Sequence, residues 1–491
     1  MRVPSALLSV VLVLLVPAVA AAAVIQGTSR PDRLRGTAKA DRIDTVFGAT
    51  DTVSCGKGVD VVTADLADRV ARDCEFVSRR ISVDTLGRSP GQHQTQVEPA
   101  VTASNATAVA TFQVGRFPGG GAAGIGWATS KDAGRTWRSR VLPSLTNASK
   151  PPGDAPRASD PVVAYDAAHG TWLISSLVLG DGFTGLGISR SSDGLSWSAP
   201  VSAVRLQANF LAYDKEWIAC DNTSTSVFYG SCYLAYTDLA TPRIALQVSR
   251  DGGATWGAPV TATAAFGLDG EGALPLIQPD GALTIVVLAE GGMYAVHSTD
   301  GGGTFAAPAR ISPLAEAAQP LLRAPPLPTA AVDASGRLLV AWADCAFRPG
   351  CDGNTIVLTT SMDGVTWSAL KRVPGTGFDS LLPGIAADPS VPGRISIVMY
   401  VRTTRACSAA TCSLGVAVVS SRDGGATWTK PRRLDAVSAR YSWLANAGGQ
   451  FVGDYVGATY SAGRFVPVFA LASRPTADGT LREYMMAASM S

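Results

Sequence analysis

The stretch Ser249-Arg250-Asp251-Gly252-Gly253-Ala254-Thr255-Trp256 indicates the fold, because close copies of it recur along the chain. Six copies occur, two of them one residue shorter, with aspartates at Asp132, Asp193, Asp251, Asp300, Asp363 and Asp423. Consecutive aspartates are 49 to 63 residues apart. Self-similarity at such a period is typical of propellers and solenoids. Apolar runs between the copies, such as 338–342 and 355–359, predict short strands separated by turns.

These octets resemble the Asp box, S-x-D-x-G-x-T-W, of the sialidase-like (BNR repeat) superfamily. The resemblance covers about four-fifths of the chain. It implies β-propeller blades, with each box in the turn between the third and fourth strands. The aspartate would accept hydrogen bonds from turn amides, and glycine would supply a positive φ. We therefore expect a structural role for the six aspartates.

The spacing gives the expected number of blades. The mean distance between the boxes is about 58 residues, and residues 80–491 would divide into seven units of about this length. We predict an all-β, seven-bladed β-propeller over 80–491, with six blades as the alternative. The last unit lacks a box, and residues 81–86 would complete it, which would close the ring and remove an exposed sheet edge.

Residues 1–23 are predicted to be a secretory signal peptide. Arg2 precedes an apolar run, and small residues follow Pro17, with cleavage expected between Ala20 and Ala23. An uncleaved membrane anchor is the alternative. No second apolar span of this length occurs, so we expect a secreted protein without a membrane span.

The eight cysteines fall into four sequence-local pairs, which predict disulfides in an oxidising compartment. Zinc is the alternative, but none of the three histidines adjoins a pair. The expected disulfides are Cys55–Cys74, Cys220–Cys232, Cys345–Cys351 and Cys407–Cys412.

Residues 24–79 form a different segment, with Gly-x4-Asp units repeating every nine residues. The segment resembles a degenerate form of the calcium-binding nonapeptide repeats of RTX proteins. The resemblance implies Ca²⁺ ligation by Asp32, Asp41, Asp51 and Asp60, although the paired glycines are largely lost. The alternative is a small disulfide-pinned β segment that acts as a cap or spacer. No other cofactor is expected.

In a propeller, the loops entering the innermost strands surround one mouth of the central channel. Aligning the units places Glu98, Asp160, Glu216 and Asp454 there, in neighbouring blades. Clustered carboxylates shift one another's pKa, which suits the acid and base of glycoside hydrolysis. We predict these four as the catalytic residues. Alternatively, each accepts hydrogen bonds from strand amides or pairs with an arginine, repeating because the blade repeats.

Five nearby residues are predicted to bind substrate, since charged and aromatic side chains recognise sugars. They are Asp214, Trp217, Glu271, Arg323 and Tyr455.

The family's catalytic set is only partly matched. Members of the sialidase family share an F/Y-R-I-P motif near the start, three arginines, a tyrosine nucleophile with a glutamate partner, and an acidic residue. No F/Y-R-I-P motif occurs here, and the most similar stretch is Gly115-Arg116-Phe117-Pro118. Near the end of the chain, Arg482-Glu483-Tyr484 only weakly resembles the arginine, glutamate and tyrosine of the family's catalytic set. The resemblance implies a glycosidase acting on an extracellular glycan, with a non-catalytic glycan- or protein-binding module as the alternative. Sialic acid specificity does not follow from it.

Charge excludes one class of partner. The chain has 41 Lys and Arg against 39 Asp and Glu, so it lacks the basic excess typical of nucleic-acid binding. We expect a monomer whose partner is a glycan.

Overall fold

The computed structural model describes residues 22–87, 91–241, 243–263 and 267–490. The predicted signal peptide therefore lies, up to residue 21, outside the described residues. Strands make up 49% of the chain, and the described residues contain no α-helix, so the all-β prediction is confirmed. None of the described residues forms a helix long and apolar enough to cross a membrane.

Residues 24–80 form a β-solenoid of about three turns. Its strands are β1 (Val24–Gln26), β2 (Arg33–Arg35), β3 (Arg42–Asp44), β4 (Thr52–Ser54), β5 (Val61–Ala64), β6 (Arg69–Val70) and β7 (Phe76–Arg80). Odd-numbered strands pair in parallel in one sheet and even-numbered strands in a second. Each nine-residue repeat thus supplies one strand, and two repeats complete a turn.

The solenoid is stabilised by a small apolar core and a ladder of carboxylates. Ile43, Val53 and Val62 are buried between its two sheets. The amides of Asp32 and Asp41 donate to the carboxylates of Asp51 and Asp60, one turn further on, at 2.8 and 2.7 Å. These side chains satisfy amides at the corners where the chain changes sheets, which explains why aspartate repeats there.

The remaining strands form antiparallel sheets. The first strands of these sheets are β8 (Gln92–Ser104), β12 (Arg157–Asp166), β16 (Tyr213–Cys220), β20 (Gly270–Ile277), β24 (Thr329–Val332), β28 (Asp379–Ala387) and β35 (Gly457–Ser461). The second strands are β9 (Thr107–Arg116), β13 (Thr171–Gly180), β17 (Cys232–Asp238), β21 (Leu283–Ala289), β25 (Leu338–Asp344), β29 (Ile395–Arg402) and β36 (Arg464–Ser473). The third strands are β10 (Ala122–Ser130), β14 (Phe183–Ser191), β18 (Arg243–Ser249), β22 (Gly292–Ser298), β26 (Thr355–Ser361), β30 (Ser413–Ser421) and β37 (Arg482–Ala488).

Shorter strands lie at the outer edges and in the connections. They are β11 (Arg138–Val141), β15 (Val201–Gln207), β19 (Val260–Thr261), β23 (Ala309–Pro313), β27 (Lys371–Arg372), β31 (Arg432–Arg433), β32 (Ala439–Arg440), β33 (Ala445–Asn446) and β34 (Gln450–Phe451), with 3-10 turns η2 (Pro349–Cys351) and η3 (Tyr441–Trp443).

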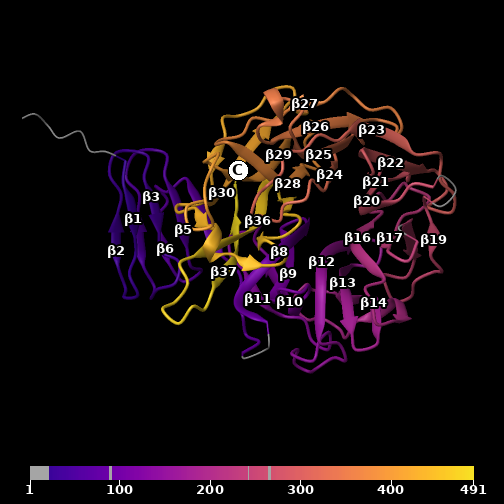
Figure 1. Cartoon of the computed structure of the whole chain (residues 1–491), viewed down its shortest axis with the longest axis horizontal. Helices are drawn as coiled ribbons and strands as arrows, with labels where there is room; N and C mark the ends of the chain where they lie inside the picture. Colours follow the sequence, from indigo (N-terminus) through magenta and orange to yellow (C-terminus); the bar gives the residue numbers. More distant parts are fainter. Residues whose placement is uncertain (1–21, 88–90, 242, 264–266, 491) are drawn as a thin grey trace, which may run out of the picture.

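The antiparallel sheets follow one another in a closed ring (Figure 1). Each first strand lies beside the next, from β8 through β12, β16, β20, β24 and β28 to β35, which returns to β8. Large apolar side chains such as Tyr233, Trp342 and Tyr400 are buried between neighbouring sheets. The ring therefore brings the beginnings of distant strands together at its centre.

The prediction of seven blades, and its alternative of six, is corrected by the strand pairing. The structure contains a β-solenoid of about three turns. The other strands do not form seven separate four-stranded sheets. β7 pairs with β37, and β10 pairs with β12, so a fifteen-stranded sheet runs from the solenoid into the ring. Pairing between the edge strands of neighbouring repeats depends on no residue pattern within a repeat. The sequence therefore suggested separate units.

In all six recurring turns one aspartate oxygen accepts from the serine hydroxyl and two amides, and in the four longer copies the other oxygen accepts from a threonine hydroxyl. In the copy at Asp251, one carboxylate oxygen accepts from Ser249 and from the amides of Ala254 and Thr255, and the other accepts from the Thr255 hydroxyl at 2.6 Å. These bonds hold the pKa of Asp251 at about 2 against the opposing effect of burial. The aspartates shape turns, as the sequence predicted.

All four predicted disulfides are present, and no cysteine among the described residues is free. Cys55–Cys74 joins two turns of the solenoid, and the other three close short loops of the ring.

Candidate functional site

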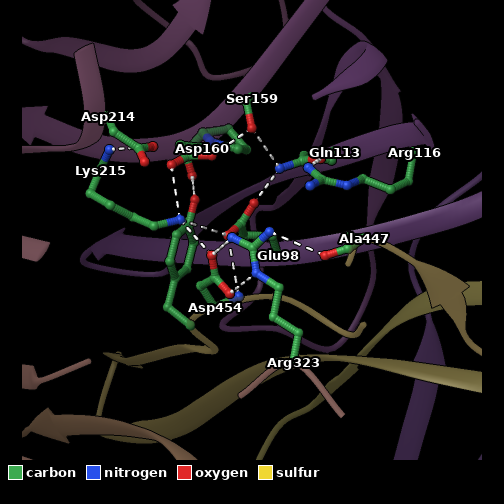
Figure 2. Close-up of polar contacts among 12 residues, drawn as sticks. Glu98, Gln113, Arg116, Ser159, Asp160, Asp214, Lys215, Arg323, Ala447 and Asp454 are labelled. Carbon is green, nitrogen blue, oxygen red and sulfur yellow. Dashed lines mark hydrogen bonds and ion pairs between the residues drawn. The ribbon is translucent and has the colours of Figure 1, made fainter. Parts of the chain in front are cut away.

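The first strands of five sheets carry a β-bulge at the same place. The register slips between Val97 and Ala100 in β8, and equivalent slips occur in β12, β16, β20 and β28. Within the bulges, φ is 59° at Glu98, 48° at Asp160 and 52° at Lys215. A positive φ is uncommon for such residues and costs on the order of 1–3 kcal/mol. Bulges re-aim side chains, and these three side chains converge on one another (Figure 2).

Lys215 lies at the centre of a group that we call the charged hub: Glu98, Asp160, Lys215 and Asp454. The Lys215 ammonium nitrogen is 2.5 Å from Oδ2 of Asp454, 3.2 Å from Oδ2 of Asp160 and 3.8 Å from Oε1 of Glu98 (Figure 2). The four side chains come from β8, β12, β16 and the segment before β35. One ammonium therefore connects four widely separated parts of the chain.

Polar side chains surround the charged hub on two sides. Gln113 donates to Glu98 and, at 3.1 Å, to the Ser159 hydroxyl, while Arg116 donates to the Gln113 carbonyl at 2.7 Å. Ser159 donates to Asp160 at 2.5 Å.

On the other side, Arg323 binds Asp454 through two nitrogens, one of them at 3.0 Å. The Arg323 side chain is 37% exposed, so the charged hub meets solvent at this residue. Arg116 and Arg323 each place a guanidinium near the Phe451 ring, at 4.7 and 5.0 Å.

The hub carboxylates differ in protonation. Burial, followed by the neighbouring Asp160, raises the pKa of Glu98 to about 8. Burial opposes ionisation of Asp160 as well, but the Lys215 ammonium outweighs it and lowers the pKa of Asp160 to about 2. Lys215 and Arg323 likewise lower the pKa of Asp454 against burial. At neutral pH, a protonated glutamate therefore lies beside two ionised aspartates.

The protonation of Lys215 and Asp214 follows from the same contacts. Burial disfavours the ammonium, but Asp160, Asp454 and Glu98 together raise the pKa of Lys215 well above its usual value. Burial and Asp160 raise the pKa of Asp214 to about 7. Lys215 is thus a cation at neutral pH, and Asp214 titrates near neutrality at the edge of the charged hub.

Three of the four predicted catalytic residues meet, and Glu216 does not join them. Both Glu216 oxygens are buried without a hydrogen-bond partner among the described residues. Glu216 lines a small cavity of about 20 Å³ together with Lys215, Trp217 and Tyr455. Burial, followed by Asp160, raises its pKa well above the usual value. Lys215, one residue earlier, occupies the bulge position that Glu98 and Asp160 occupy in their strands.

The predicted substrate-binding residues divide in the same way. Asp214 and Arg323 border the charged hub. Trp217 and Tyr455 pack edge to face at 5.2 Å, and the Tyr455 hydroxyl donates to the Pro161 carbonyl, so they serve packing. Burial raises the pKa of Tyr455 well above its usual value, which does not suit a tyrosine nucleophile. Glu271 is exposed on β20.

Lys215, Gln113 and Arg116 were not predicted. The alignment of the units placed Glu216 at the bulge position, and the residue that occupies this position is Lys215, one residue earlier. In a strand, such a shift moves every side chain to the opposite face.

The predicted calcium ligands accept hydrogen bonds within the solenoid. Asp41, Asp51 and Asp60 each use an oxygen to accept a backbone amide of the preceding turn. Asp32 accepts from Thr28 of its own turn. Within residues 22–87 and the other described ranges, no three His, Cys, Asp or Glu side chains lie close enough to hold a metal ion. Calcium binding here remains a prediction without structural support.

No family model and no curated protein matches the chain. Similar solved structures include a protein of unknown function from Dyadobacter fermentans (TM-score 0.46, 18% identity, covering 67% of this chain and 95% of that one). An α-L-arabinofuranosidase from Fusarium graminearum has a TM-score of 0.47 and 16% identity, covering 70% of this chain and 98% of that one. The NanB sialidase of Streptococcus pneumoniae has a TM-score of 0.43 and 14% identity, covering 84% of this chain and 70% of that one. These similarities are too distant to carry an activity over to this chain.

Proposed function

We propose that this protein is a secreted glycosidase that hydrolyses an extracellular glycan at the charged hub. One observation carries the proposal: the carboxylates of Glu98, Asp160 and Asp454 converge on the Lys215 ammonium, at 3.8, 3.2 and 2.5 Å. Burial raises the pKa of Glu98 to about 8, whereas Lys215 lowers the pKa values of Asp160 and Asp454 against burial. Neighbouring carboxyl groups with separated pKa values are typical of an acid and its nucleophilic or basic partner. Glu98 would protonate the leaving oxygen, and Asp454 would act as nucleophile or base.

Two cationic side chains would hold this arrangement. Lys215 and Arg323 keep Asp454 ionised, and the Asp454 amide donates to Glu98 at 3.2 Å, which fixes the two groups relative to each other. A substrate would approach at Arg323, which borders the charged hub and is partly exposed.

A second candidate function is glycan binding without hydrolysis. It is favoured by the burial of the charged hub, where Glu98, Asp160 and Asp454 are 1%, 4% and 2% exposed. Carboxylates so enclosed also suit a structural role, in which Lys215 holds the ring closed.

The two candidates are separated by a glycosidase assay. The wild-type chain should hydrolyse at least one member of a panel of aryl glycosides that includes sialosides and α-L-arabinofuranosides. Glu98→Gln should lower kcat by about 10²- to 10⁴-fold, as expected for loss of a general acid. The exposed Glu290→Gln is the matched control and should retain full activity.

Circular dichroism of each variant confirms that it is folded. No turnover of any glycoside by the wild type, or full activity in Glu98→Gln, would contradict hydrolysis at the charged hub. In the first case, binding without hydrolysis becomes the better account.

A further inference from the structure

A groove of about 820 Å³ lies between the solenoid and the last sheets of the ring. We call it the junction groove. The solenoid contributes residues of β1 and β3 and the turn at Phe47, and the ring contributes residues near β32, η3, β36 and β37. In Figure 1 these ring strands (yellow) stand beside the solenoid (indigo). The groove is separate from the charged hub and shares no lining residue with it.

Three arginines give the junction groove a positive charge. Arg440, Arg474 and Arg482 line it, the first two exposed and the third partly buried. Among the described residues, no carboxylate lies within 4.0 Å of these three guanidinium groups, so none is neutralised by an ion pair.

The single acidic side chain in the lining does not offset this charge. Asp44 accepts a hydrogen bond from the Thr63 hydroxyl at 2.7 Å. Burial raises its pKa above the usual value. The electrostatics of the groove therefore favour an anionic ligand.

Aromatic rings line both sides of the junction groove. On the solenoid side, Phe47 has a φ of 67°, a strained conformation for a bulky residue. The guanidinium carbons of Arg80 and Arg482 lie 4.5 and 5.0 Å from the centre of the Phe47 ring. The Tyr484 ring packs edge to face against it, with ring centres 4.9 Å apart. On the side of the groove formed by the antiparallel sheets, the Arg440 guanidinium lies 6.0 Å from the centre of the Trp443 ring. Fixed rings beside guanidinium groups that lack a carboxylate partner suit contact with a hydroxyl-bearing, anionic ligand.

We propose that the junction groove binds an acidic sugar chain, whose carboxylate or sulfate groups pair with Arg440, Arg474 and Arg482 while its rings pack on Phe47 and Trp443. Hydroxyl groups of Ser29 and Ser413 in the same lining would bind sugar hydroxyls. Arginine suits both anions, because its planar fork binds them through two hydrogen bonds. The inference is independent of hydrolysis at the charged hub.

The test is titration calorimetry of the mature chain with polygalacturonate, with heparin and with neutral dextran. We expect binding to one or both acidic polymers, weakened by salt, and none to dextran. The two acidic arms distinguish carboxylate from sulfate recognition. The combined variant Arg440→Gln, Arg474→Gln, Arg482→Gln should lose about a hundredfold in affinity, because three charged hydrogen-bonding groups are removed.

A control variant removes the same charge elsewhere, through Arg69→Gln, Arg138→Gln and Arg140→Gln, which are exposed and are not among the residues that line the groove. It should bind like the wild type. Trp443→Ala should also weaken binding, with unchanged thermal unfolding showing that it is folded. Equal losses in both triple variants, equal binding of dextran, or equal binding of double-stranded DNA would overturn the inference.

Discussion

Replacing Lys215 with methionine is expected to lower the free energy of unfolding by about 3–5 kcal/mol, the usual cost of removing one partner from a buried ion pair. Methionine fills nearly the same space, but it leaves Asp160 and Asp454 ionised in an environment where they are 4% and 2% exposed. Arg323 would still neutralise part of the charge on Asp454. Urea unfolding at pH 7 measures the effect.

The cost should shrink at acid pH, because the two aspartates can then take up protons. Lys371→Met is the matched control, since Lys371 is exposed on β27, and it should change stability by less than about 0.5 kcal/mol. A loss in Lys215→Met below about 1 kcal/mol, similar at pH 4 and pH 7, would mean that Lys215 does not hold the hub carboxylates as described.

The free energy of unfolding is expected to fall as pH rises from about 5 to about 8. The folded-state pKa of Glu98 is about 8, above its ordinary value of 4.5, so the folded chain keeps a proton that the unfolded chain has lost. The contribution of Glu98 is therefore fully present below pH 4.5 and is lost as pH rises toward 8. Its slope is about −1.4 kcal/mol per pH unit. Asp214 and Glu216, whose pKa values are also raised, act in the same direction.

The Glu98→Gln variant has no carboxyl group at this position that can titrate. Its free energy of unfolding should therefore fall less steeply with pH than that of the wild type. The difference between variant and wild type, measured by urea unfolding at pH 5, 6, 7 and 8, should move in favour of the variant as pH rises. Glu290→Gln, exposed, should follow the wild type. Parallel curves for wild type and Glu98→Gln would show that Glu98 is ionised in the folded chain.

The local structure of the repeats could be predicted well from sequence. A serine, an aspartate and one or two glycines at fixed spacing specify a turn by short-range hydrogen bonds, and all six turns formed as expected. The four disulfides followed from cysteines close in sequence. The arrangement of the sheets did not follow, because pairing such as β7 with β37 joins strands about 400 residues apart. No local pattern encodes such a contact.

The charged hub was predicted in part for a related reason. Glu98, Asp160 and Asp454 stand at the beginnings of strands, and the ring brings them together. The β-bulge at Lys215 decides which of two adjacent charged residues faces the centre, and it depends on backbone register rather than on residue type. The junction groove could not be predicted from the sequence. Its arginines become neighbours of Phe47 only when the solenoid packs against the ring.

The protonation of Glu98 tests the central claim most directly. The chain has only seven glutamates, so ¹³C labelling of their side-chain carboxyl groups and comparison with Glu98→Gln would assign the Glu98 signal. We predict that this carboxyl is protonated at pH 7 and titrates near pH 8. A Glu98 carboxyl that titrates near its ordinary value of 4.5 would contradict the buried, Lys215-centred arrangement on which the proposed chemistry depends.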